Sequence, residues 1–178
     1  MDNSTKVSSA DIDAARLGKM DSRFAMATRE ENARAALALI SDVKNTVDIF
    51  TPDLEPHIYD QTDFLERLTM PPLGKPRANV RILVKDSQRA VKNGHRLIEL
   101  TRKLSSYMEI RRVHRDFADY DEAFMLVDNC GVMRRRVPAR FTGTICFNDT
   151  NEVTRLKKIF DEIWDRSDPD PELRRLNI

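Results

Sequence analysis

The apolar positions of the chain follow two periods, and the change from one to the other separates predicted helices from predicted strands. Between residues 28 and 44, apolar side chains recur every three or four positions, which places them on one face of a helix. That face is formed by Ala33, Ala36, Leu37, Ile40 and Val43. Thr28 and Glu31 have the spacing of a capping box, so this helix is predicted to begin at Thr28.

Four other segments are predicted to be helical, at 11–20, 61–69, 86–104 and 150–164. The third is capped by Asp86 or Ser87 and is predicted to be continuous, with His95 in its interior. Asp149 and Glu152 repeat the capping-box spacing at the start of the fourth.

Short runs rich in β-branched and apolar residues predict six strands, at 46–51, 79–85, 108–113, 123–128, 132–135 and 144–147. The fourth and fifth form a hairpin, in which Gly131 supplies the conformational freedom of the turn. The order of elements requires crossover connections early in the chain, and these join parallel strands. The sequence therefore predicts an α/β fold, in which helices flank a mixed sheet with a largely parallel core.

The chain is predicted to divide into one folded body and two extensions. Residues 28–166 form the α/β domain, residues 1–27 a polar lead-in, and residues 167–178 an extended C-terminal arm. Prolines between 71 and 76 predict an extended connection inside the domain rather than a boundary between domains.

Composition excludes several classes of function. Hydrophobic residues make up 40% of the 178 and charged residues 33%, which is typical of a globular protein. The 30 basic residues nearly balance the 29 acidic ones, so any binding of an anion must come from a local patch. No apolar run is long enough to span a bilayer, and the N-terminus lacks the pattern of a secretory signal.

Cysteine and histidine spacing gives little support for a metal or a redox site. Cys130 and Cys146 belong to no Cys-x-x-Cys motif, and reduced thiols in a core are favoured over a disulfide or a metal site. No two of the three histidines have ligand spacing. We therefore expect a cytoplasmic protein with no metal and no cofactor.

The order of elements and several short segments resemble one half of the phospholipase D-like superfamily, over roughly residues 30–166. The segments that carry the resemblance are NVRILVK, MEIRRV, FMLVD and FDEIW. The chain also resembles an uncharacterised bacterial family through GHRLIELTRKLSS and PELRRLNI. Members of that family are associated with predicted acetyltransferases, so the resemblance implies an acetyltransferase as a protein partner.

The phospholipase D-like signature is a His-x-Lys pair followed by an aspartate, and this chain departs from it. With the aspartate at Asp128, the nucleophilic histidine falls on Asp121 and the phosphate-binding lysine on Ala123. The Gly-Ser segment of the superfamily falls near Arg135 and Arg136. A carboxylate repels a phosphate dianion and alanine cannot neutralise its charge, so we expect no phosphodiesterase activity by the usual mechanism.

The resemblance also bears on oligomeric state, because catalysis in this superfamily uses two such motifs and this chain has room for one half. A homodimer that pairs two halves is expected by analogy. The expected function is recognition of a phosphate-bearing ligand, nucleic acid among them, or of a protein partner. The alternative is an enzyme with a rebuilt site of His95, His114 and Asp121.

Eight residues are candidates for ligand binding: Asp53, His95, Arg96, Arg112, His114, Arg134, Arg135 and Arg136. The run from Arg134 to Arg136 would bind phosphate bidentately, unless alternate arginines point to opposite faces and pair with carboxylates. His95 either faces a crevice or is fixed by Glu99 or a backbone carbonyl. Asp53 follows the first predicted strand and either lines a ligand site or forms a turn.

Overall fold

The computed structural model describes residues 9–69, 79–170 and 173, and within these residues one sheet of eight strands runs through the molecule. The spatial order is β1-β7-β6-β5-β2-β3-β4-β8. The strands are β1 (Arg23–Met26), β2 (Thr46–Thr51), β3 (Asn79–Val84), β4 (Met108–Arg112), β5 (Ala123–Val127), β6 (Gly131–Arg135), β7 (Gly143–Cys146) and β8 (Asp168–Pro169). The six strands predicted from the sequence are all present, with bounds that agree to within one residue.

The predicted mixed sheet with a parallel core is confirmed. β2 pairs with β3 and β3 with β4 in parallel, whereas β2 and β5 are antiparallel and β5, β6, β7 and β1 continue as antiparallel neighbours. Every residue of β5 is buried, as expected for a strand that is covered on both faces.

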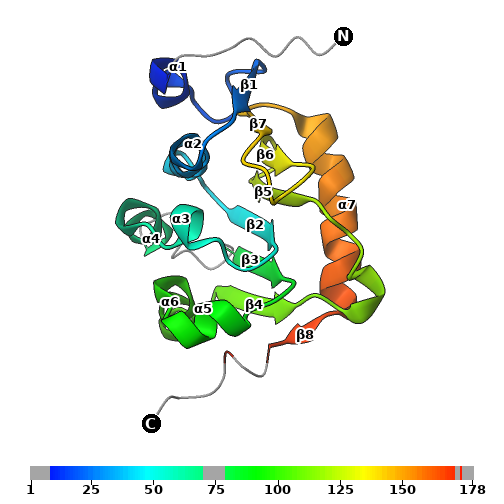
Figure 1. Ribbon diagram of the computed structural model, residues 1–178. Helices are drawn as coiled ribbons and strands as arrows, with labels where there is room; N and C mark the ends of the chain where they lie inside the picture. The colour runs from blue at the N-terminus through cyan, green and yellow to red at the C-terminus, as the bar shows by residue number, and fades with distance from the viewer. Residues whose placement is uncertain (1–8, 70–78, 171–172, 174–178) are drawn as a thin grey trace.

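Helices cover both faces of the sheet (Figure 1). The helices are α1 (Ser9–Ala14), α2 (Arg29–Ser41), α3 (Pro56–Tyr59), α4 (Thr62–Thr69), α5 (Gln88–Asn93), α6 (Arg96–Lys103), the short 3-10 helix η1 (Arg115–Phe117) and α7 (Thr150–Arg166). α1 to α6 lie on one face and α7 lies on the other. The core divides accordingly, with Ile49 packed on the side of α2 and Phe50 packed on the side of α7.

A charged network fastens α7 to the parallel strands. Asp48 is almost fully buried, and its carboxylate accepts hydrogen bonds from Arg81 at 2.8 Å and from Lys157 at 2.9 Å. The Arg81 guanidinium also contacts the faces of Phe160 and Trp164. Because a buried charge is costly unless it is paired, these contacts fix the position of α7 across the sheet.

The predicted continuous helix over 86–104 is wrong, because the chain breaks into α5 and α6. Gly94 ends α5 with a φ of 72°, a left-handed conformation that glycine adopts without strain. His95 then begins α6 as its N-cap, and its side chain accepts a hydrogen bond from the Leu97 N–H. Apolar periodicity continued across the break and concealed it.

The predicted role of Gly131 also needs correction. The left-handed residue of the hairpin is Asp128, with a φ of 51°, whereas Gly131 has no positive φ. A Cβ at Gly131 would lie 2.6 Å from Leu17 Cδ1 and 2.9 Å from Leu39 Cδ1. Glycine is therefore required there by the close approach of α2 and the N-terminal segment, not by turn geometry.

Both predicted extensions contribute strands to the sheet. β1 pairs with β7 over four residues, and β8 pairs with β4 through Arg111 and Arg112. The proline-containing connection at 71–76 and most of the predicted C-terminal arm lie outside the described residues. Of the helices that the structure describes, none has the length and apolarity needed to cross a membrane.

The two predicted capping boxes have different outcomes. At Thr28 both reciprocal hydrogen bonds are present. At Asp149 the side chain accepts from the Glu152 N–H, but the Glu152 carboxylate binds Arg134 and Arg155 instead of closing the box. The start of α7 is thereby connected to β6.

Candidate functional site at the carboxyl edge of the sheet

The carboxyl ends of the three parallel strands meet at one edge of the sheet, beside the start of β5 and the end of β6. In open α/β sheets, ligands bind outside the carboxyl ends of the strands. Ala123 and Arg135, at opposite ends of the predicted hairpin, both lie at this edge as direct cross-strand partners. A ligand site is therefore expected at this edge.

Arg135 is buried at this edge in an ion pair with Glu55. Its Nη2 donates to both carboxylate oxygens of Glu55 at 2.5 Å, and its Nη1 donates to the Pro138 carbonyl at 3.1 Å. The two side chains are only 1% and 5% exposed, and the Thr51 hydroxyl donates to the same carboxylate at 3.1 Å. Burial raises the pKa of the Glu55 carboxyl, and the Arg135 guanidinium offsets part of that rise. The charge of Arg135 is thus neutralised inside the protein.

The loop that carries Glu55 is conformationally strained. Leu54 and Glu55 have φ values of 66° and 27°, in a region that side chains other than glycine rarely adopt. The Asp53 carboxylate accepts a hydrogen bond from the Glu55 N–H at 3.1 Å, which is the turn-forming role, one of the two alternatives for this residue. The strain is held in place by the buried contact to Arg135.

His95 is buried and fixed by the backbone on both sides of its ring. Its Nδ1 accepts from the Leu97 N–H at 3.2 Å, and its Nε2 lies 3.1 Å from the Leu54 carbonyl. This pattern assigns a neutral ring with the proton on Nε2, and burial lowers the pKa of His95. His95 was expected to be fixed by Glu99 or by a backbone carbonyl, and the structure shows the carbonyl, that of Leu54. Arg96 is turned to Asp60, which it contacts at 2.6 Å.

The motif positions have separate structural roles. Asp128 accepts hydrogen bonds from the backbone N–H groups of Lys44, Asn45 and Thr46, which ties the hairpin to the start of β2. The Asp121 side chain is 82% exposed and forms an ion pair with Lys85 at 3.1 Å. A solvated carboxylate in that position repels a phosphate dianion and does not replace the histidine nucleophile.

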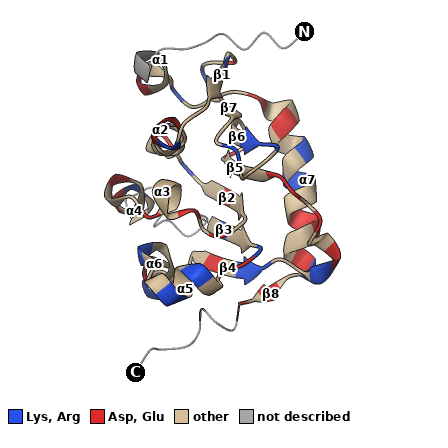
Figure 2. Ribbon diagram, viewed as in Figure 1, with Lys and Arg blue, Asp and Glu red and all other residues tan. Residues whose placement is uncertain are grey.

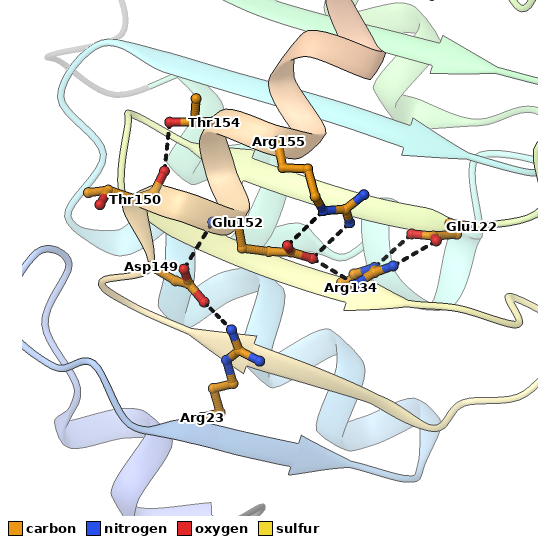
Figure 3. Close-up of polar contacts among 8 residues, drawn as sticks. All are labelled: Arg23, Glu122, Arg134, Asp149, Thr150, Glu152, Thr154 and Arg155. Carbon is orange, nitrogen blue, oxygen red and sulfur yellow. Dashed lines mark hydrogen bonds and ion pairs between the residues drawn. The ribbon is translucent and has the colours of Figure 1, made fainter. Parts of the chain in front are cut away.

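The run of arginines does not form one patch. Arg134 points to the face of α7, where Glu122 and Glu152 hold its guanidinium at 2.6–2.7 Å (Figure 3). Arg135 points to the opposite face, as alternation along a strand requires. Arg136 is exposed and forms no ion pair with any described residue. Of the two alternatives for the run, the second therefore holds for Arg134 and Arg135: they point to opposite faces of the sheet and pair with carboxylates.

A cavity of about 490 Å³ lies beside the start of α7, over β1, β7 and β6. Four arginines line it: Arg23, Arg134, Arg136 and Arg140. The first is bound to Asp149 at 2.5 Å and the second to two glutamates, so half of these cations are already paired (Figure 3). Arg136 and Arg140 remain at the rim.

A second cavity, of about 510 Å³, lies at the ends of β3 and β4. Its basic residues are Lys85, Arg112, His114 and Arg115. The structure thus brings together two of the eight candidates, Arg112 and His114, and adds Lys85 and Arg115, which were not among them. The sequence carried a signal for both residues, because Lys85 ends one predicted parallel strand and Arg115 follows the next, and ligand-binding loops are found at such strand ends.

Neither the histidines nor the cysteines form a recognisable metal centre. In the part of the chain that is described, no group of three or more His, Cys, Asp and Glu side chains is placed to hold a metal ion. Cys130 and Cys146 are free thiols, and burial raises the pKa of both.

Comparison with known sequences identifies a family but no characterised relative. Residues 28–176 match the family described as Domain of unknown function (DUF7931). No curated protein sequence is significantly similar to the chain.

Solved structures share the fold at low sequence identity. Nuc from Salmonella typhimurium, a phospholipase D family member, superposes with a TM-score of 0.59 at 12% identity, over 84% of this chain and 97% of Nuc. Phosphatidylserine synthase of Haemophilus influenzae gives 0.58 at 13% identity, over 89% of this chain and 42% of the synthase. TrmBL2, an archaeal chromatin protein that binds DNA, gives 0.60 at 13% identity over 83% of this chain. The chain spans about half of TrmBL2, 54% of its length. The fold is therefore phospholipase D-like.

Proposed function

The chain belongs to the family described as Domain of unknown function (DUF7931), and we propose that it is a non-catalytic phospholipase D-like module whose function is recognition. The ligand is a phosphate-bearing molecule that binds at the carboxyl edge of the sheet. The observation that carries the proposal is the buried Glu55–Arg135 pair beside Ala123.

The pair changes the chemistry available at the motif. The resemblance places a phosphate-binding lysine at Ala123 and a glycine near its cross-strand partner Arg135. In this chain the small residue and the cationic residue have exchanged strands, so a positive charge is kept at nearly the same place. Glu55 neutralises that charge, and electrostatic stabilisation of a transferring phosphoryl group requires an unpaired cation aimed at it.

Among the described residues, neither Asp121 nor His95 is placed to replace the missing histidine. Asp121 is solvated and bound to Lys85, and His95 uses both ring nitrogens to hold the backbone. The alternative enzyme requires His95, His114 and Asp121 to act together, yet no hydrogen bond or ion pair among the described residues joins any two of them. These contacts support recognition rather than a rebuilt catalytic site.

The test is turnover of three phosphodiesters: bis(4-nitrophenyl) phosphate, phosphatidylcholine vesicles and a single-stranded oligodeoxynucleotide. We expect product release equal to that of buffer. Asp121→Asn is the matched variant, because its side chain is 82% exposed and its replacement leaves folding intact. Turnover that scales with protein concentration and disappears in Asp121→Asn or His114→Ala would overturn the proposal.

The homodimer and the acetyltransferase partner stay predictions of the sequence resemblance. Light scattering over a range of protein concentrations tests the first, and co-purification with a co-expressed acetyltransferase tests the second.

A further inference from the structure

We propose that the cavity at the ends of β3 and β4, lined by Lys85, Arg112, His114 and Arg115, binds a single phosphate group of a small phosphorylated molecule. The inference rests on the proposed function and names its site and ligand class. We call this cavity the edge groove. The edge groove is separate from the run of Arg134 to Arg136 that the sequence suggested. Of its four basic residues, only Arg112 and His114 were among the eight candidates.

The edge groove has hydrogen-bond donors that the protein does not use itself. Arg112 is exposed and forms no ion pair with any described residue, and the Arg115 side chain is 92% exposed with its nearest carboxylate at 4.0 Å. Guanidinium groups match the geometry of phosphate oxygens and bind them bidentately. The two arginines therefore supply most of the donors.

His114 and Lys85 add two oriented donors. His114 Nδ1 accepts a hydrogen bond from the Asp116 N–H at 3.3 Å, which leaves the proton of the neutral ring on Nε2. Lys85 Nζ is held by the Tyr120 carbonyl and by Asp121, both at 3.1 Å. Because Asp121 is largely solvated, its bond to Lys85 is weak and does not cancel the lysine charge.

The surroundings of the groove select a compact anion over a long one. Asp168 lines the groove itself, Asp121 is paired with Lys85, and Asp116 lies beside Arg115. Figure 2 shows basic residues at the ends of β3 and β4 and acidic residues along the segment that leads to β5. A nucleic-acid strand places several phosphates along the surface and would meet repeated repulsion from these carboxylates, whereas a single phosphate group bound by the two arginines bears less of it. The near-neutral chain, with 30 basic and 29 acidic residues, also offers no field that recruits a polyanion.

The cavity over β1, β7 and β6 is the natural comparison. It also contains four arginines, but Arg23 and Arg134 are bound to carboxylates at 2.5–2.7 Å. Its other two arginines, Arg136 and Arg140, form no ion pair within the described part of the chain, and they provide a control that removes equal charge from another part of the surface.

Isothermal titration at low ionic strength with inorganic phosphate, glucose 6-phosphate, adenosine monophosphate and a single-stranded oligonucleotide tests the inference. We expect binding of the compact phosphates, and a Kd raised at least tenfold in Arg112→Gln/Arg115→Gln. The control Arg136→Gln/Arg140→Gln should change the Kd less than twofold. All four positions are exposed or at a rim, so both variants are expected to fold.

The outcomes separate this inference from the proposed function. No binding of any compact phosphate, equal weakening in both double variants, or binding of the oligonucleotide alone would overturn the edge groove. Cleavage of a bound phosphate ester would overturn the non-catalytic proposal and leave the groove standing. Retention of binding with no cleavage, lost only in Arg112→Gln/Arg115→Gln, is the result that supports both.

Discussion

Ala123 and Arg135 are direct cross-strand partners on β5 and β6, and both are buried, at 2% and 1% exposure. Cross-strand partners share one face of a sheet, so a large residue on one strand demands a small one opposite. Glu55 comes from the loop after β2 and completes the arrangement with two hydrogen bonds at 2.5 Å. The edge that the resemblance marks as catalytic is thus filled by a neutral, self-contained ion pair.

Truncation of Arg135 should be strongly destabilising. Arg135→Ala leaves the Glu55 carboxylate buried without its cationic partner, which costs about 3–5 kcal/mol of the free energy of unfolding. Urea denaturation followed by circular dichroism measures this. Arg136→Ala, one residue further and exposed, should change stability by less than about 0.5 kcal/mol. Similar losses in the two variants would show that the ion pair does not hold this edge together.

Exchange of the two side chains tests the cross-strand relationship itself. Ala123→Lys places a second cation at a buried position beside Arg135, so the variant should unfold at clearly lower urea concentration than the parent. Arg135→Gly in the same chain removes one of the two cations and the crowding, and it returns the lysine–glycine arrangement. We expect the double variant to be more stable than Ala123→Lys alone. Simple additivity of the two losses would refute the relationship.

His95 should make stability fall as the pH is lowered. Burial lowers its pKa below the ordinary value of 6.5, so the unfolded chain takes up a proton before the folded chain does. Its stabilising contribution is fully present above pH 6.5 and is lost as the pH falls towards the lowered pKa. His95→Asn keeps an N-cap acceptor but does not titrate. Thermal melts between pH 5 and 8 should therefore show a shallower pH dependence in the variant, and an unchanged slope would exclude His95 as its source.

Gly131 should tolerate no side chain. Alanine there would place a Cβ within 3.0 Å of both Leu17 and Leu39, an overpacking that costs about 1–3 kcal/mol. The comparison is Gly131→Ala with and without Leu17→Ala, measured by urea denaturation. Removal of the Leu17 side chain should recover part of the loss, whereas independent, additive effects would show that the contact is not the cause.

Local signals in the sequence were sufficient for six of the eight described strands and for most of the helices. β2 and β3 are short runs of β-branched and aliphatic residues, and the structure places both within one residue of the prediction. The break before α6 was missed because the apolar stripe continues through it, although Gly94 next to a capping residue is a recognised stop signal. β1 was missed because four residues are too short a run to establish a period within the polar N-terminal segment.

Contacts between distant residues decided the parts of the site that the sequence did not predict. Glu55 and Arg135 are 80 positions apart, and nothing near Glu55 distinguishes it from a loop glutamate. The division of the arginine run between two faces followed from strand alternation, but the carboxylates that pair with Arg134 could be identified only once α7 was in place. Lys85 and Arg115 become neighbours only because β3 and β4 are parallel and adjacent.

A crystal structure of the chain grown with sodium tungstate tests the central claim most directly, because anomalous scattering marks each bound tetrahedral anion. We predict an anion within hydrogen-bond distance of Arg112 in the edge groove, with Arg135 still bound to Glu55 and no anion beside it. An anion bound to Arg135 in place of Glu55 would contradict the account and would show that this edge binds phosphoryl groups.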